Sequence, residues 1–185
     1  ADSWPSYHGD YTGKRHSKLT QITPKNVNQL TLAWAFQTER SPTIKSSPLL
    51  VDGILYFTTP DNVWAVDARY GHQIWRYTYP PHQGFPIGQR GVAMYTASLY
   101  FTTPDAHLIC LDAKDGKVRW NIVIADSAKG YWTTLSPLVV RNHVIVGVSG
   151  DFDNLRGFLR SIDPDTGKTQ WTWYSTPPSG TPDQP

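Results

Sequence analysis

The hydrophobic residues of this chain fall in short strand-like runs, separated by residues that favour turns. Clear examples are Trp64–Val66, Leu108–Leu111 and Phe158–Ile162. Each run leads into an Asp and then a Gly, and a second strand-like stretch follows that ends on Trp. This alternation of short apolar runs and turn signals is typical of β-hairpins. The pattern predicts hairpins that carry a large aromatic residue at a fixed place.

The frame Asp-x-x-x-Gly-x-x-x-Trp describes these hairpins and recurs along the chain. It falls at Asp67/Gly71/Trp75, Asp112/Gly116/Trp120 and Asp163/Gly167/Trp171. The Gly can adopt the positive φ that a tight turn requires. We interpret the three Asp residues as turn formers. An active site needs only one catalytic base, whereas this Asp recurs in every repeat. The Trp residues are predicted to pack in the core between repeats.

A second repeat gives the period. The segment Leu55–Asp61 returns letter for letter as Leu99–Asp105, 44 residues later. A period in the forties, with about four short strands per unit, is typical of a β-propeller blade rather than a helical solenoid. The sequence therefore predicts an all-β protein with the fold of a β-propeller.

The repeats divide the chain into an arm and about three blades. Expected segments are an N-terminal arm at 1–30, a closing strand at 31–38 that carries Trp34, blades at 44–79, 90–125 and 134–176, and a terminal loop at 177–185. Closed propellers usually have four to eight blades. We therefore expect the missing blades to come from further sequence, from another chain or from self-association.

Composition agrees with a folded domain and excludes several functions. Eight Trp, ten Tyr and 39% apolar residues argue against disorder. The net charge of +2 comes without a basic run, so no nucleic-acid or membrane-surface partner is implied. No apolar run reaches the roughly 18 residues of a membrane span. The six His residues lack metal-ligand spacing, and the single Cys110 is expected to be a small buried residue.

The beginning of the chain bears on its location. It reads Ala1-Asp2-Ser3-Trp4, without Met, which would suit the mature end left by a signal peptidase. We expect a periplasmic or secreted protein.

Several motifs together resemble the quinoprotein alcohol dehydrogenases, eight-bladed propellers that bind pyrroloquinoline quinone (PQQ). The matching segments are Trp4-Pro5-x-Tyr7, Leu32–Trp34, Ser47–Gly53, Arg90–Ala93, Leu111–Trp120, Arg156–Phe158 and Asp163–Lys168. The resemblance covers most of the chain. It implies that this is the N-terminal part of such a propeller, whose Trp repeats are the family's docking motif between blades.

The resemblance also implies which residues meet the cofactor. Arg90 matches a family Arg that contacts the quinone, and Thr134 matches a Ser or Thr contact, with Thr133 as the second choice. Lys45 stands where the family has a Glu. The adjacent cysteines that precede the family Arg are absent from 85–89. A planar guanidinium suits the carboxylates of an anionic quinone, although Arg90 also fits a loop Arg that pairs with an Asp or a backbone carbonyl.

The metal site implied by the resemblance departs from the family pattern. Phe152 occupies the position of a Glu that binds Ca²⁺, and Asp151 or Asp153 could substitute for it. Calcium takes several carboxylate and carbonyl oxygens from a flexible loop. Asp is also common in turns for local backbone bonding, so the acidic segment is open to both interpretations.

Two functions follow from these residues. The first is the N-terminal part of a PQQ-dependent alcohol dehydrogenase, with Ca²⁺ or a lanthanide beside the quinone and a cytochrome c as electron acceptor. The second is a propeller without cofactor that serves as a scaffold or protein-binding subunit, which Lys45, Phe152 and the missing cysteines favour. In the first case the catalytic Asp would come from later blades, outside these 185 residues.

Overall fold

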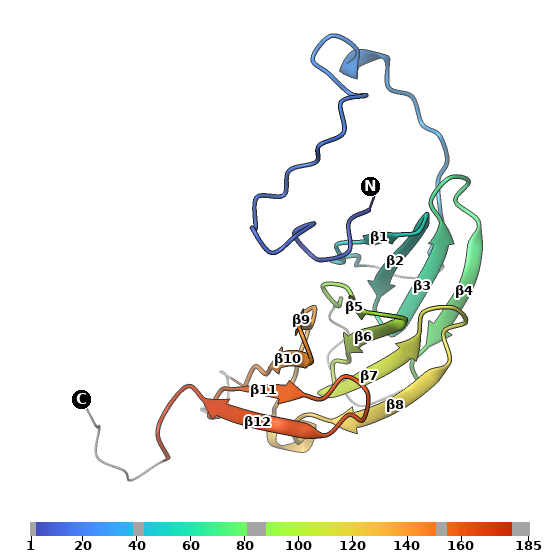
Figure 1. Cartoon of the computed structure of the whole chain (residues 1–185). Coiled ribbons are helices and arrows are strands. Elements are labelled where there is room, and N and C mark those ends of the chain that lie inside the picture. The colour runs from blue at the N-terminus through green and yellow to red at the C-terminus, as the bar shows by residue number, and fades with distance from the viewer. Residues whose placement is uncertain (1–2, 39–42, 81–87, 151–154, 179–185) are drawn as a thin grey trace.

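The computed structural model describes residues 3–38, 43–80, 88–150 and 155–178, and they fold into three four-stranded antiparallel sheets (Figure 1). The first blade consists of β1 (Leu49–Val51), β2 (Ile54–Thr59), β3 (Asn62–Asp67) and β4 (Gln73–Thr78). The second consists of β5 (Ala93–Tyr95), β6 (Ser98–Thr102), β7 (His107–Asp112) and β8 (Val118–Val123). The third consists of β9 (Leu138–Val140), β10 (His143–Gly147), β11 (Phe158–Ile162) and β12 (Thr169–Tyr174).

The strands of each blade pair in the order in which they occur along the chain. The sheets stack side by side in an arc, with β1, β5 and β9 on its inner side and β4, β8 and β12 on its outer side (Figure 1). Two short 3-10 helices, Val27–Gln29 and Ser127–Lys129, lie in the arm and before the third blade. The predicted all-β propeller fold is confirmed.

The core lies between the blades, because neighbouring sheets bury their facing side chains against each other. Leu99 and Phe101 of the second blade pack toward the first blade, whereas Tyr100 and Leu108 pack toward the third. This is the period-2 alternation of a strand whose two faces are both covered. Cys110 is fully buried in the second of these clusters, as the sequence predicted.

The Asp and Gly of the repeated frame form the turn between the third and fourth strands of each blade. In the first blade the Asp67 carboxylate accepts hydrogen bonds from the backbone N–H groups of Arg69 and Tyr70, at 2.8 and 2.9 Å. Gly71 has a φ of +70° and donates its N–H to the carbonyl of Asp67. Asp67 therefore has the turn-forming role inferred from the sequence.

The segment 31–38, predicted as a closing strand, packs on the first blade. Within the described residues, no strand pairing includes 31–38. The segment lies against the face of the first blade, where the Phe36 ring meets Phe57 and Trp64 edge-on. It thus contacts the first blade through side chains. Its role as a closing strand stays a prediction, since a closing strand forms its backbone hydrogen bonds with the last blade of a ring and not with the first. Its Trp34 still donates the indole N–H to the Ala68 carbonyl at 3.1 Å.

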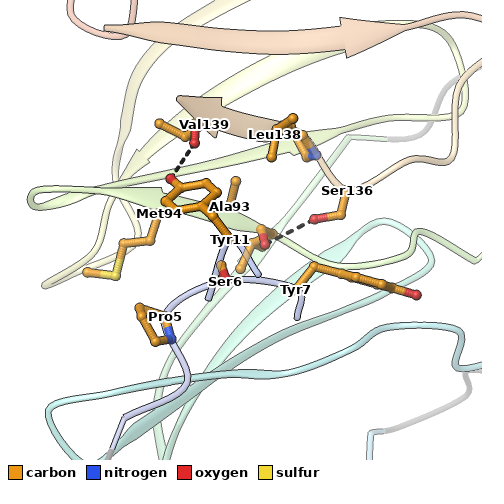
Figure 2. Close-up of a pocket in the computed structure, with 11 residues that line it drawn as sticks. Pro5, Ser6, Tyr7, Tyr11, Ala93, Met94, Ser136, Leu138 and Val139 are labelled. Carbon is orange, nitrogen blue, oxygen red and sulfur yellow. Dashed lines mark hydrogen bonds between the residues drawn. The ribbon is translucent and has the colours of Figure 1, made fainter. Parts of the chain in front are cut away.

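The N-terminal arm crosses the inner side of the arc and reaches the third blade. Tyr11 donates its hydroxyl to the carbonyl of Val139 in β9 at 2.6 Å. Beside this bond the arm closes a small cavity of about 50 Å³ against β5 and β9 (Figure 2). Such a volume suits water rather than an organic ligand.

Candidate cofactor-binding site

Three segments, each preceding the innermost strand of one blade, contact one another. The N–H of Ser47, before β1, donates to the carbonyl of Arg90, before β5, at 3.1 Å. The N–H of Arg90 in turn donates to the carbonyl of Thr134, before β9, at 3.0 Å. Arg90 is therefore the central member of a row of backbone contacts that spans all three blades.

The side chains of Arg90 and Thr134 also contact each other. Arg90 donates from Nη1 to the Thr134 hydroxyl oxygen. Arg90 is exposed, whereas Thr134 is buried. A guanidinium carries five N–H donors in a fixed fork, so this bond orients the group and leaves further donors for an anion. The structure thus brings together two of the residues that the resemblance assigned to the quinone.

Lys45 precedes Ser47 by two residues and is exposed. Its Cγ lies 3.5 Å from the position that a Cβ on Gly88 would take. Gly88 precedes Arg90 by two residues, which places the Lys45 stem beside the Arg90 segment. The three segments before the innermost strands therefore carry two cationic side chains and a hydroxyl group.

A buried polar network holds the Arg90 segment in place, and sequence reasoning missed it. Gln89 is 1% exposed, and its Nε2 donates to the carbonyl of Thr133 at 3.3 Å. Its Oε1 accepts from the hydroxyl of Thr102 at 3.2 Å, and its backbone carbonyl accepts from Thr58 at 3.1 Å. The repeated Thr58 and Thr102 in the two Thr-Thr-Pro-Asp segments were the available signal. The second-choice residue Thr133 is 1% exposed, and its hydroxyl has no partner within the described chain.

A second polar cluster lies between the first and second blades. Asp105 accepts hydrogen bonds from the hydroxyls of Tyr79, at 3.0 Å, and Thr103. Burial and the hydrogen bond to Asp105 raise the pKa of Tyr79. His107 contacts Asn121 at 2.8 Å and lies 3.9 Å from Asp105. Every side chain of this cluster has a partner within it, which is typical of a structural junction between blades.

The predicted metal ligands Asp151 and Asp153 lie outside the described residues, as does Phe152. Among the residues that are described, no three His, Cys, Asp or Glu side chains gather in a metal-binding arrangement. None of the helices in this part of the chain has the length and apolar character needed to cross a membrane. The contacts of the described residues therefore concern the quinone end of the predicted site and not its metal.

Residues 4–185 match the model of the PQQ-dependent glucose/ethanol/alcohol dehydrogenase β-propeller domain. The chain belongs to this PQQ dehydrogenase family.

Individual members of the PQQ dehydrogenase family agree with this assignment. A quinohemoprotein alcohol dehydrogenase of Comamonas testosteroni is 36% identical over 192 residues, which cover 98% of this chain and 27% of the relative. The solved structure of the quinohemoprotein alcohol dehydrogenase ADHIIG of Pseudomonas putida superposes with a TM-score of 0.87 at 34% identity, covering 95% of this chain and 27% of that one. A europium-containing methanol dehydrogenase gives a TM-score of 0.87 at 34% identity, over 95% and 32%. The chain spans about a quarter of the length of the curated relatives it matches.

Proposed function

We propose that this chain is the N-terminal part of a PQQ-dependent alcohol dehydrogenase and supplies one side of its quinone site. The proposal is carried by the contact of Arg90 with Thr134, which brings together donors from the segments before the innermost strands of the second and third blades. Lys45 adds a second cation beside the same segment. In this proposal all three residues bind and orient the cofactor.

The described donors fit the chemistry of an anionic quinone. Its carboxylates would be held by Arg90 and Lys45 through charge-assisted hydrogen bonds, which are stronger than neutral ones. The buried Thr134 holds the Arg90 fork in one orientation, so little side-chain freedom is lost on binding. When bound, PQQ supplies the redox chemistry by accepting two electrons from the alcohol, and the protein positions it. Ca²⁺ or a lanthanide beside the quinone, with Asp151 or Asp153 among its ligands, belongs to the same proposal.

The remaining parts of the proposed enzyme lie beyond this chain. Further blades would complete the ring and provide the residue that takes the alcohol proton, and a cytochrome c would receive the electrons. The proposed location is the periplasm or the cell exterior, which fractionation of cells that express the full-length protein would check.

The alternative is a propeller without cofactor that acts as a scaffold. Lys45 favours it, because the resemblance places an acidic side chain there and the cation reverses the local charge. The lack of cysteines in 85–89 points in the same direction. Quinone binding therefore decides between the two functions.

The deciding experiment titrates the full-length protein with PQQ and Ca²⁺ and follows tryptophan fluorescence and quinone absorbance. We expect saturable binding, and we expect Arg90→Gln to weaken it by about ten- to a hundredfold, the range for a lost hydrogen bond to a charged group. Arg69→Gln is the matched control, since Arg69 lies in the turn after β3 beside Tyr70. No binding by the unsubstituted protein, with or without a lanthanide in place of Ca²⁺, would favour the scaffold.

A further inference from the structure

The N-terminal arm is fastened at two points to blades that are not neighbours. Near its start, Trp4 donates its N–H to the Leu50 carbonyl in β1 at 2.7 Å and accepts from the Leu50 N–H at 3.0 Å. Further along, Tyr11 donates its hydroxyl to the Val139 carbonyl in β9 at 2.6 Å. The stretch between Trp4 and Tyr11 therefore runs from the first blade to the third, and on its way it passes β5 of the second blade.

Ser6 lies in this stretch and carries a buried hydroxyl. Its Oγ is shielded from solvent, and no group of the described chain hydrogen-bonds to it. A buried hydroxyl that makes no hydrogen bond is costly, because the group gives up its bonds to bulk water when the protein folds. Native structures nearly always satisfy such groups with protein atoms or with ordered water. The Ser6 hydroxyl therefore indicates a bound partner.

The cavity beside the arm offers space for this partner. Ser6 is one of its lining residues, together with Tyr11 and Ser136 (Figure 2). Its volume of about 50 Å³ exceeds the space that one water molecule needs. The same volume lies far below the roughly 300–1,000 Å³ of a site for an organic ligand. The size of the cavity thus selects water as its occupant.

The hydroxyls that line the cavity have complementary hydrogen-bonding capacities. Tyr11 uses its hydrogen on the Val139 carbonyl, and the Ser136 hydroxyl donates to the Val92 carbonyl at 3.2 Å. Both hydroxyl oxygens can still accept, whereas Ser6 still has a hydrogen to donate. Because a water molecule both accepts and donates, it can join the Ser6 hydroxyl to either of the other two.

The cavity also borders the candidate cofactor-binding site. Val92 follows Arg90 by two residues, and Ser136 follows Thr134 by two. The bond from Ser136 to Val92 therefore joins the same two segments as the contact of Arg90 with Thr134. A molecule in this cavity would touch both of these segments and the arm.

We propose that the cavity is a binding site for an internal water molecule, which accepts the hydroxyl hydrogen of Ser6 and donates to the hydroxyl oxygen of Tyr11 or Ser136. The water attaches the middle of the arm to the segments of the second and third blades that carry the candidate site. The arm is then held at three places along its length instead of two. This site goes beyond the proposed function, because it needs no quinone.

The first test is a crystal structure of the full-length protein at a resolution that reveals ordered water. We expect density for one oxygen atom within hydrogen-bond distance of Ser6 Oγ and of the hydroxyl of Tyr11 or Ser136. Absence of such density would overturn the inference. So would density that contacts Ser6 alone, or a direct bond from Ser6 to a group of a further blade.

The second test measures how often the arm opens, by hydrogen exchange and mass spectrometry of the full-length protein. Ser6→Ala removes the donor to the water, and Ser3→Ala is the matched control because Ser3 is exposed in the same arm. Circular dichroism verifies that both variants fold. We expect the peptide 3–12 to exchange about three- to tenfold faster in Ser6→Ala, the range for one lost hydrogen bond, and to change less than about twofold in Ser3→Ala.

The direction of the change in Ser6→Ala distinguishes a hydroxyl that binds water from one without a partner. Removing a hydroxyl without a partner relieves the cost of burying it, so the arm would open less often. Unchanged or slower exchange in Ser6→Ala, or equally faster exchange in Ser3→Ala, would therefore reject the water site.

Discussion

The ring of Trp75 lies against Gly116, although the two residues belong to different blades. A Cβ built on Gly116 would lie 2.6 Å from Cε3 of Trp75, and the Trp75 indole N–H donates to the carbonyl of Ala113 at 3.0 Å. The same contact joins Trp120 to the turn of Gly167, where the indole N–H donates to the Pro164 carbonyl at 3.1 Å. The outer strand of one blade is thus attached to the turn of the next.

This relationship predicts a large effect of Gly116→Ala on stability. Gly116 has a φ of +73°, so any side chain there is strained, and here it would also collide with the Trp75 ring. Gly53→Ala is the matched control, because Gly53 has a φ of +77° and open space around its Cβ position. We expect Gly53→Ala to lower the free energy of unfolding by about 1–2 kcal/mol and Gly116→Ala by clearly more. Urea unfolding measures both, and equal losses would contradict the contact.

Gln89→Leu tests the buried network beside Arg90. Leu has a similar volume but leaves the Thr133 carbonyl without its hydrogen-bond donor. The expected loss is about 1–3 kcal/mol in the free energy of unfolding, the range for a buried group that loses its partner. Gln73→Leu, at the exposed start of β4, should stay within about 0.5 kcal/mol. Chemical denaturation at pH 7 would reveal the difference, and a neutral Gln89→Leu would exclude a stabilising network.

Asp112 is predicted to contribute to the acid sensitivity of the fold. Its hydrogen bond from Arg119, at 2.7 Å, lowers its pKa, and a bond from the N–H of Lys114 adds to this. Because the folded state binds the Asp112 proton less tightly than the unfolded state, its contribution is present above about pH 4 and lost as the pH falls through the folded pKa. The free energy of unfolding measured from pH 6 to pH 2.5 should therefore fall less steeply in Asp112→Asn. Arg119→Gln removes the first cause of the shift and should flatten the curve similarly; identical slopes in all three proteins would refute the assignment.

The Cys110 thiol is predicted to be unreactive in the folded protein. It is fully buried, and burial raises its pKa, so the nucleophilic thiolate is disfavoured at neutral pH. A thiol reagent such as DTNB should give no rapid reaction in native buffer and one equivalent per chain in guanidinium chloride. Cys110→Ala supplies the blank. Fast labelling without denaturant would show that the β7 region opens readily.

The hairpins could be predicted from the sequence because interactions between residues close in the chain form their turns. The turn at Asp67 and Gly71 depends on a carboxylate that accepts nearby N–H groups and on a glycine with positive φ, and both requirements lie within a few residues. The contacts of 31–38 could not be predicted in the same way. Trp34 indicated a closing strand, which stays a prediction, whereas the packing of Phe36 on the first blade depends on neighbours in space.

The sequence by itself determined the all-β blades and their period, and through the resemblance it proposed Arg90, Thr134 and Lys45 as contacts of the quinone. Only the tertiary structure decided that Arg90 bonds to Thr134. It also decided that Gln89 is buried among polar groups, since a lone glutamine carries no motif. Turn and strand preferences act between residues close in sequence, whereas these contacts join segments about 40 residues apart that stacking of the blades brings together.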